Sequence, residues 1–214
     1  MKKAILAAAI LGAAVLTVNP FAAPNPVFAA EQTATAEAAV PQLTYTYTSK
    51  NYGYTIQCPQ KPVGVIPASE LYPDKKGEVL IFDNDGYDIK KAWVIITDAF
   101  EESKVPDLNK LTEPEAETLL KGIFETNAYE SIMTVNLTPT NRGIYAVTAK
   151  TVDIDTDGDG KADVTATADT QMAITFFRGE KGGRYQIMLI DNPNLLVQDV
   201  ALYQRGVVSF QETK

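Results

Sequence analysis

Residues 143–168 read GIYAVTAKTVDIDTDGDGKADVTATA. The segments 143–152 and 164–168, on either side of the central Asp/Gly-rich part, are rich in Val, Thr and Tyr, which favour strands over helices. Asp and Gly between two such segments are typical of a turn. The pattern therefore predicts a β-hairpin whose tip is formed by residues 155–163, and it excludes the helix–loop–helix that the acidic spacing alone could suggest.

The tip places oxygen ligands at a regular spacing. Asp155, Asp157 and Asp159 stand at alternate positions, Lys161 can offer its backbone carbonyl, and Asp163 can bind directly or through a water molecule. Ca²⁺ takes six to eight hard oxygen ligands at roughly 2.3–2.6 Å. Because this spacing supplies most of them, we predict a Ca²⁺ site at the hairpin tip. Other hard cations, Mg²⁺ or Mn²⁺, could occupy it weakly.

The register of the loop follows from its glycines. Counting from Asp155 puts Gly160 sixth, where the chain must turn tightly. Counting from Asp153 puts Gly158 sixth but Lys161 ninth, where a cationic side chain is a poor ligand, so the first register is preferred. The alternative to an ion site is an acidic, solvated turn.

The tip resembles the calcium loops of dockerins, thrombospondin-type repeats and other EF-hand-like proteins. It lacks the bidentate Glu of an EF-hand at position twelve, where the chain has Ala166. The resemblance implies an ion and no activity. Extracellular sites of this kind bind Ca²⁺ with a Kd of about 10⁻⁴–10⁻³ M, which suits a structural ion better than a switch.

The N-terminal residues indicate export. The basic start Lys2-Lys3 precedes an apolar run, Ala4–Val18, and small residues suit cleavage after Ala29 or, second, after Ala30. Residues 1–29 are therefore predicted to be a secretory signal peptide. The apolar run of about 15 residues is shorter than the roughly 20 that a membrane-spanning helix needs. No membrane span is expected after cleavage.

The sequence predicts one domain behind this leader. Residues 30–42 are rich in Ala, Thr, Glu and Pro without periodicity, which indicates a flexible linker. Residues 43–214 are expected to form a single α+β domain. The lysine-led signal, the single Cys and the acidic balance suggest a bacterial protein in the periplasm, in the cell envelope or outside the cell.

Composition excludes several functions. The formal charge is −8, and removal of the predicted signal peptide with Lys2 and Lys3 would make it more negative. A nucleic-acid or anionic-lipid partner is therefore not expected. The chain has no His, which excludes Ser-His-Asp and Cys-His catalysis and the usual zinc enzymes. Cys58 cannot form an internal disulfide and is interpreted as a buried structural thiol.

Alternation and turn signals predict the remaining elements. Strands are expected at 44–48, 54–58, 78–82, 92–97, 131–138, 143–153, 164–177 with a break near Asp169, and 184–190. The first two should form a hairpin, 83–88 should be a turn and 59–76 a loop. Thr112 and Glu115 form a capping box that opens a helix to about Thr126. Asn192-Pro193 is predicted to open a second helix, to about Tyr203.

This order of elements predicts an α+β fold, an antiparallel sheet with helices packed on it. The opening Tyr-rich hairpin that ends in Pro59, the long meander and a C-terminal helix finishing in Ser209-Phe210 resemble PsbP-like proteins. The resemblance implies an α/β/α sandwich, with the calcium hairpin as an addition to the family pattern. It also implies an accessory or binding role, because PsbP-like proteins generally act in that way.

The leading hypothesis is thus an exported, non-enzymatic domain whose Ca²⁺ ion rigidifies a hairpin used to bind an unknown protein or glycan partner in the envelope. One alternative is a calcium-dependent carbohydrate-binding or partner-binding module, in which exposed tyrosines stack on sugars; the candidates are Tyr45, Tyr47, Tyr52 and Tyr87. A less favoured alternative is a carboxylate-based glycoside hydrolase, using Glu101, Glu102 or Glu130 with a distant Asp.

Overall fold

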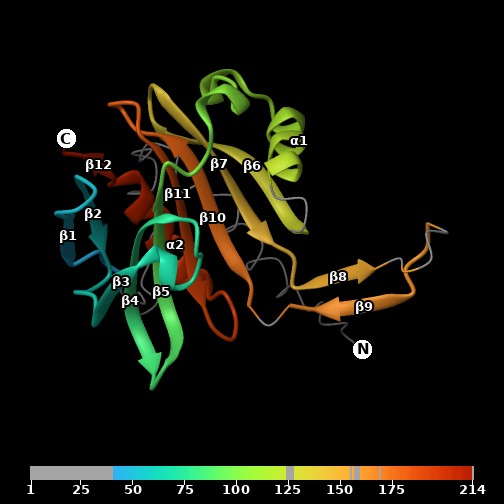
Figure 1. Cartoon of the computed structure of the whole chain (residues 1–214), viewed down its shortest axis with the longest axis horizontal. Helices are drawn as coiled ribbons and strands as arrows, with labels where there is room; N and C mark the ends of the chain where they lie inside the picture. The colour runs from blue at the N-terminus through green and yellow to red at the C-terminus, as the bar shows by residue number, and fades with distance from the viewer. Residues whose placement is uncertain (1–40, 124–127, 155, 157–159, 169, 214) are drawn as a thin grey trace, which may run out of the picture.

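The computed structural model describes residues 41–123, 128–154, 156, 160–168 and 170–213 (Figure 1). Its centre is a seven-stranded antiparallel sheet in the order β3-β4-β5-β11-β10-β7-β6. The strands of this sheet are β3 (Gly64–Pro67), β4 (Lys76–Asp85), β5 (Asp88–Thr97), β6 (Tyr129–Thr138), β7 (Asn141–Thr148), β10 (Met172–Arg178) and β11 (Arg184–Asp191). We call it the main sheet.

Two smaller sheets and two helices complete the regular structure. A three-stranded sheet joins β1 (Tyr45–Ser49), β2 (Tyr54–Cys58) and β12 (Gln211–Glu212), and a separate hairpin pairs β8 (Thr151–Ile154) with β9 (Val164–Thr167). The helices are α1 (Glu113–Ile123) and α2 (Val197–Val208). The β1–β2 hairpin confirms the sequence prediction, with Tyr45 opposite Cys58 and Ser49 opposite Tyr54.

One face of the main sheet packs against α2 and the β1-β2-β12 sheet. Alternate residues of the strands point to this side, and Trp93 of β5 lies at its centre, 1% exposed. The Trp93 ring meets Phe82 and Tyr203 edge-on, at centroid distances of 5.3 and 6.0 Å. The Tyr203 hydroxyl donates to the Ile187 carbonyl at 2.6 Å. Helix α2 is thereby fixed to the sheet by both packing and a buried hydrogen bond.

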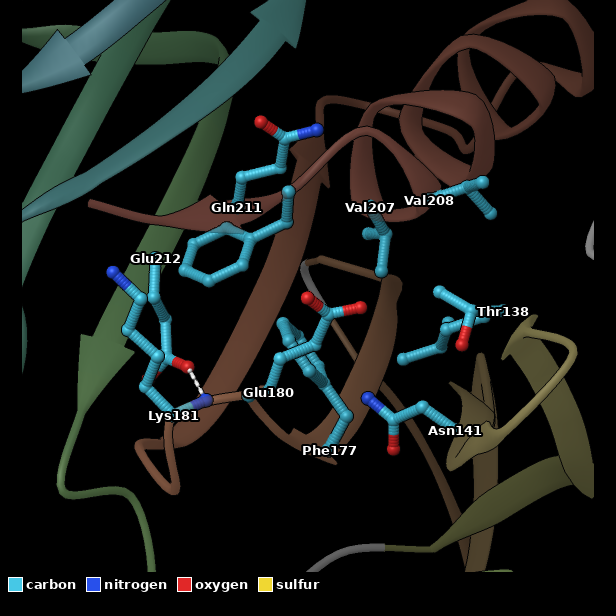
Figure 2. A pocket seen from close by; sticks show the side chains of 12 residues that line it. Thr138, Asn141, Phe177, Glu180, Lys181, Val207, Val208, Gln211 and Glu212 are labelled. Carbon is cyan, nitrogen blue, oxygen red and sulfur yellow. Dashed lines mark hydrogen bonds between the residues drawn. The ribbon is translucent and has the colours of Figure 1, made fainter. Parts of the chain in front are cut away.

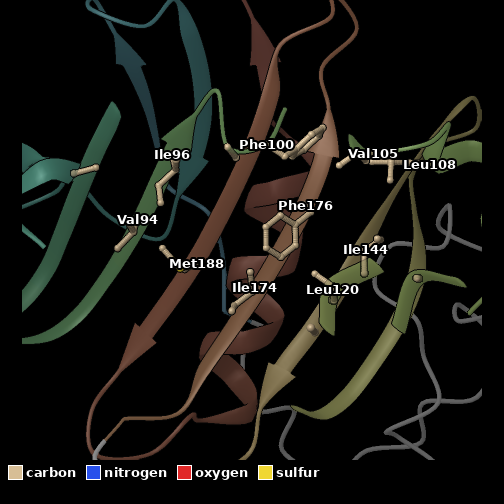
Figure 3. Packing of buried hydrophobic residues seen from close by; sticks show 14 of the residues in the cluster. Val94, Ile96, Phe100, Val105, Leu108, Leu120, Ile144, Ile174, Phe176 and Met188 are labelled. Carbon is tan, nitrogen blue, oxygen red and sulfur yellow. The ribbon is translucent and has the colours of Figure 1, made fainter. Parts of the chain in front are cut away.

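The opposite face packs against α1 and the segment that precedes it (Figure 3). Val94, Ile174 and Met188 of the sheet are buried there beneath Phe100 and Leu120. The main sheet therefore lies between two covering layers, one of them reinforced by strands. This arrangement confirms the predicted α+β class with helices packed on an antiparallel sheet.

Helix α1 begins as the capping box predicts. The Thr112 backbone N–H and hydroxyl both donate to Glu115 Oε2, at 2.8 and 2.7 Å, and this pair satisfies groups that the first helical turn leaves open. Of the predicted apolar face, Ala116 and Leu120 are buried and Leu119 is half-buried. The predicted end near Thr126 lies outside the described residues.

Helix α2 starts later than predicted. Its first residue is Val197, and Asn192-Pro193, which we expected as N-cap and first helical residue, precede it with a cis peptide bond between them. Asn192 instead extends the main sheet, because its backbone N–H donates to the Lys90 carbonyl at 2.8 Å and its side-chain amide to the Ile89 carbonyl at 3.0 Å. The helix runs on to Val208, past the predicted end at Tyr203.

The segment 59–76, predicted as a loop, contains β3 and a short 3₁₀ turn at Ala68–Glu70. Among the strands that the structure describes, β3 is an edge strand that pairs with β4 alone, and Pro67 at its end has no N–H to offer a further strand. The opposite edge is β6, whose pairing with β7 is irregular at two places, between Tyr129 and Ser131 and between Asn136 and Thr138. The Asp83–Asp88 turn is shorter than predicted, since β4 extends to Asp85 and β5 begins at Asp88.

The predicted strand 143–153 is broken into two. Strand β7 ends at Thr148 and β8 begins at Thr151, while on the returning side β9 ends at Thr167 and β10 begins at Met172, close to the expected break. The two breaks face each other. They separate β7 and β10, which pair in the main sheet, from β8 and β9, which pair with each other in a separate two-stranded sheet.

Candidate functional site

The β8–β9 hairpin projects from the end of β7 and β10, away from both covering layers (Figure 1). Within the described residues β8 pairs only with β9, in the register Thr151 opposite Thr167 and Ile154 opposite Val164. The ladder continues at the base, where the Ala168 N–H donates to the Lys150 carbonyl at 2.8 Å. The register makes residues 155–163 the connecting loop, as the sequence predicts.

Part of the predicted Ca²⁺ loop is described. The Thr156 N–H and hydroxyl donate to Asp163 Oδ2 at 2.9 and 2.6 Å, so the two ends of the loop are tied together. Gly160 has φ of +83°, the left-handed conformation that the sixth position of such a loop requires. Lys161 is exposed, and the loop turns at its predicted position.

Asp155, Asp157 and Asp159 lie outside the described residues. Among the residues that the structure does describe, no three His, Cys, Asp or Glu side chains are grouped closely enough to hold a metal. The Ca²⁺ site thus stays a prediction from the sequence.

The base of the hairpin is tied to the body of the protein. The Lys150 ammonium donates to Asn194 Oδ1 at 2.7 Å, and Ala149 N–H donates to the Ala128 carbonyl at 2.9 Å. Beyond this base, Val164 is 53% exposed and no part of β9 enters either apolar cluster. Strand β9 is therefore held mainly by its ladder with β8.

A charged cluster that the sequence analysis missed lies at the end of β11, near Asn194. Lys91 Nζ is 2.7 Å from Asp199 Oδ2 and 3.9 Å from Asp191 Oδ1, and both carboxylates are buried. Asp191 Oδ2 also accepts the Leu196 N–H at 2.9 Å. Burial raises the pKa of Asp191, the Leu196 N–H opposes this, and the nearby Asp199 raises it further. This cluster holds the chain at the start of α2.

A second buried carboxylate, Glu78, lies under the β1–β2 hairpin. It is 5% exposed, and Tyr54 donates its hydroxyl to Glu78 Oε2 at 2.8 Å. Burial and the Glu78 carboxylate together hold the pKa of Tyr54 far above its usual value, so the hydroxyl keeps its proton. The apolar run in 78–82 indicated a strand but gave no sign that the carboxylate of its first residue would be buried.

The C-terminal strand is clasped by the β10–β11 turn (Figure 2). Glu212 accepts from Lys181 N–H, from Gly183 N–H at 2.9 Å and from the Tyr185 hydroxyl at 2.9 Å. A side chain on Gly179 or Gly183 would put Cβ within 2.3 Å of the Glu212 carboxyl group, so the carboxyl group can keep its present position only with glycine at both positions. The Glu212 clasp joins the small sheet to the main sheet.

The structure does not bring the three candidate catalytic carboxylates together. Glu101 pairs with Lys104 at 2.9 Å, Glu102 pairs with Arg178, and Glu130 accepts from Gln171 at 2.8 Å. All three are exposed, and each has a different partner. Their arrangement gives no support to a pair of carboxylates facing one sugar bond.

The candidate tyrosines separate into two groups. Tyr47 and Tyr52 are half-buried against the apolar cluster on the α2 side, and Tyr45 is also half-buried, as is usual for alternating strands. Tyr87, at the β4–β5 turn, is fully exposed. Cys58 is buried as predicted, and burial raises the pKa of its thiol to about 12, which makes it unreactive.

Comparison with known proteins supports the fold and goes no further. No protein-family model matches the sequence, and no curated protein matches it significantly. The solution structure of cyanobacterial PsbP (CyanoP) from Synechocystis sp. PCC 6803 superimposes with a TM-score of 0.51 and 9% identity, over 84% of this chain and 98% of that one. The protein thus shares the fold of PsbP-like proteins. No helix in the described part of the chain has the length and apolar character to cross a membrane.

Proposed function

We propose that the protein is an exported, non-enzymatic binding or accessory domain whose β8–β9 hairpin carries a structural Ca²⁺ ion at its tip. The observation that carries this proposal is the hairpin itself, because β8 and β9 leave the main sheet and project away from both covering layers (Figure 1). A projecting element of this kind is suited to contact a partner while the packed sheets supply rigidity.

The loop residues supply the ligands that Ca²⁺ prefers. The carboxylates of Asp155, Asp157 and Asp159, the Lys161 carbonyl and the Asp163 carboxylate would hold the ion. Asp163 is already held at the neck of the loop by Thr156. A bound ion would neutralise carboxylates that otherwise repel one another, and so keep the tip in one conformation.

A structural role fits the exposed position of the hairpin. Because no residue of β9 is fully buried and Val164 is 53% exposed, this strand gains little of the apolar stabilisation that the main sheet has. With millimolar Ca²⁺ outside the cell and a Kd of about 10⁻⁴ M, binding would stabilise the fold by roughly 1.4 kcal/mol. This is enough to order a hairpin and too little to decide whether the domain folds.

Two further features favour binding over catalysis. The whole chain lacks His, the commonest acid–base group near neutral pH. The fold likeness to PsbP-like proteins, which generally act as accessory or binding proteins, points the same way by analogy. The signal-like N-terminus places such a domain in the periplasm, in the envelope or outside the cell.

The test is thermal unfolding of the purified protein, measured once with about 2 mM Ca²⁺ and once with excess chelator. This Ca²⁺ concentration is on the order of twentyfold above the expected Kd. We expect Ca²⁺ to raise Tm by several degrees and the Asp157→Ala/Asp159→Ala variant to lose this shift. The matched control is Asp83→Ala/Asp85→Ala, which removes two exposed acids from the other Asp-rich turn and should keep the shift. An unchanged Tm in the parent protein, or an equal shift in both variants, would count against the hairpin site.

A further inference from the structure

A pocket of about 360 Å³ lies beside the Glu212 clasp, between the β6–β7 turn, the β10–β11 turn and the end of α2 (Figure 2). Its walls include Leu137, Phe177 and Val207, all of which are buried, and the ring of Phe210. Its volume is near the lower end of the roughly 300–1,000 Å³ of ligand pockets. It has room for one extended side chain rather than for a cofactor.

One carboxylate in this pocket has no partner among the described residues. The Glu180 carboxylate lies in the middle of the pocket, between Val207 and Asn141, while the side chain of Lys181 points away (Figure 2). The other acid in the wall, Glu212, is already satisfied by its three donors. Glu180 is exposed, so the pocket combines apolar walls with one solvent-facing carboxylate that is available to a cation.

The aromatic rings form part of the apolar wall. Phe177 and Phe210 meet edge-on with centroids 5.2 Å apart, and Phe177 also stacks on Tyr185. This packing fixes the rings that line the pocket. An alkyl chain that ends in a positive charge matches both parts of the site, since its stem can pack on the apolar wall and its head can reach Glu180.

We propose that this pocket binds a lysine or arginine side chain of a partner protein. The protein's formal charge of −8 would attract a basic partner surface. Val208, which also lines the pocket, is 38% exposed and offers an apolar contact to residues flanking the inserted side chain. The proposal rests on the proposed function only in taking the ligand from a protein partner; it does not depend on Ca²⁺.

The experiment is a titration followed by ¹⁵N NMR, with N-acetyl-lysine N-methylamide as the probe and chelator present throughout. We expect saturable shifts of the backbone signals of Lys181, Gly183 and Phe210, with a Kd of about 1 mM for a ligand of this size. The arginine analogue should give the same pattern, and the norleucine analogue, which lacks the charge, should give none. The absence of saturable shifts would overturn the proposal.

Two variants separate the Glu180 contact from general charge attraction. Glu180→Gln keeps the size of the side chain and should weaken binding about tenfold, because the charge-assisted hydrogen bond is lost. Glu70→Gln removes an exposed acid outside this pocket and should leave the Kd unchanged. Equal weakening by both variants, or none by Glu180→Gln, would contradict a specific site.

n-Butylamine distinguishes a protein side chain from a free amine. It has the alkyl chain and the single charge of a lysine side chain but no flanking peptide groups, so it should bind more weakly than the blocked lysine. Equal or tighter binding of n-butylamine would overturn the assignment to a partner protein and make this a small-amine pocket. Because chelator is present, failure of the Ca²⁺ prediction leaves these outcomes interpretable.

Discussion

The main sheet and the β8–β9 hairpin are continuous along the chain but are stabilised in different ways. On the main sheet, Trp93 and its neighbours are sealed under α2 and the small sheet, and Ile174 and Met188 are sealed on the other face. On the hairpin, Val164 is 53% exposed and each strand pairs only with the other within the described residues. The same kind of β-rich sequence is thus held by burial in one region and, as we propose, by an ion in the other.

The strongest test of this difference is removal of the central core side chain. Trp93→Ala should lower the free energy of unfolding by about 3–5 kcal/mol, because it leaves a cavity that the sheet cannot close. Denaturant titration measures the change, and the exposed Val65→Ala serves as control with an expected change below about 0.5 kcal/mol. A loss of less than about 1 kcal/mol for Trp93→Ala would mean that burial is not what holds the main sheet.

The Glu212 clasp comes next in size. Glu212→Gln should lower the free energy of unfolding by about 2 kcal/mol, since an amide replaces one of the two carboxylate oxygens that receive N–H and O–H donors. Urea titration measures the loss, and Glu70→Gln is again the control because its carboxylate is exposed. If both variants unfold at the same urea concentration, the clasp adds nothing to the union of the two sheets.

Hydrogen exchange examines the hairpin directly. With Ca²⁺ present, we expect amides of β8 and β9 to exchange about tenfold more slowly than in chelator, because the bound ion must leave before the hairpin opens. Amides of β5 and β11, in the middle of the main sheet, should exchange equally in both conditions. If Ca²⁺ slowed amide exchange equally in the hairpin and in the main sheet, the two regions would not be stabilised independently.

The smallest effect concerns pH and the cluster at the start of α2. Since the pKa of Asp191 is raised in the folded protein, the folded state binds this proton more tightly than the unfolded state does. Its contribution is therefore largest below the ordinary Asp pKa of about 3.9 and is lost as pH rises through the folded pKa.

Asp191→Asn tests the direction in which Asp191 changes stability with pH, because the amide cannot titrate but can still accept the Leu196 N–H. Free energies of unfolding measured from pH 7 down to pH 4 should show the parent protein gaining stability relative to the variant on acidification. The exposed Asp83→Asn is the control and should follow the parent protein. If the parent protein instead loses stability relative to Asp191→Asn as pH falls, the raised pKa of Asp191 in the folded protein is contradicted.

Local signals in the sequence predicted the elements whose causes are local. The Thr112–Glu115 capping box and the β1–β2 hairpin depend on residues within a few positions of one another, and both are confirmed. The β8–β9 register was predictable for the same reason, because turn residues lie between two strand-forming segments. The Ca²⁺ ligands remain a prediction, although Gly160 has the left-handed conformation expected of the sixth position.

Features that depend on distant partners were not predictable. Nothing near Gly64–Pro67 indicates that β4 pairs with it, so a Pro-rich segment looked like a loop. Asn192-Pro193 has the residues of a helix start, but the distant Lys90 carbonyl holds Asn192 in the sheet. The buried carboxylates of Glu78, Asp191 and Asp199 find their partners on other elements, and a single sequence gives no sign of those meetings.

The two edges of the main sheet have a consequence for the protein at high concentration. An open edge strand is a template on which a second copy can add its own strand and begin aggregation. Strand β3 is short and ends in Pro67, and β6 departs from regular pairing near each of its ends. Both features interrupt the row of backbone groups that a second copy would need in order to pair with either edge.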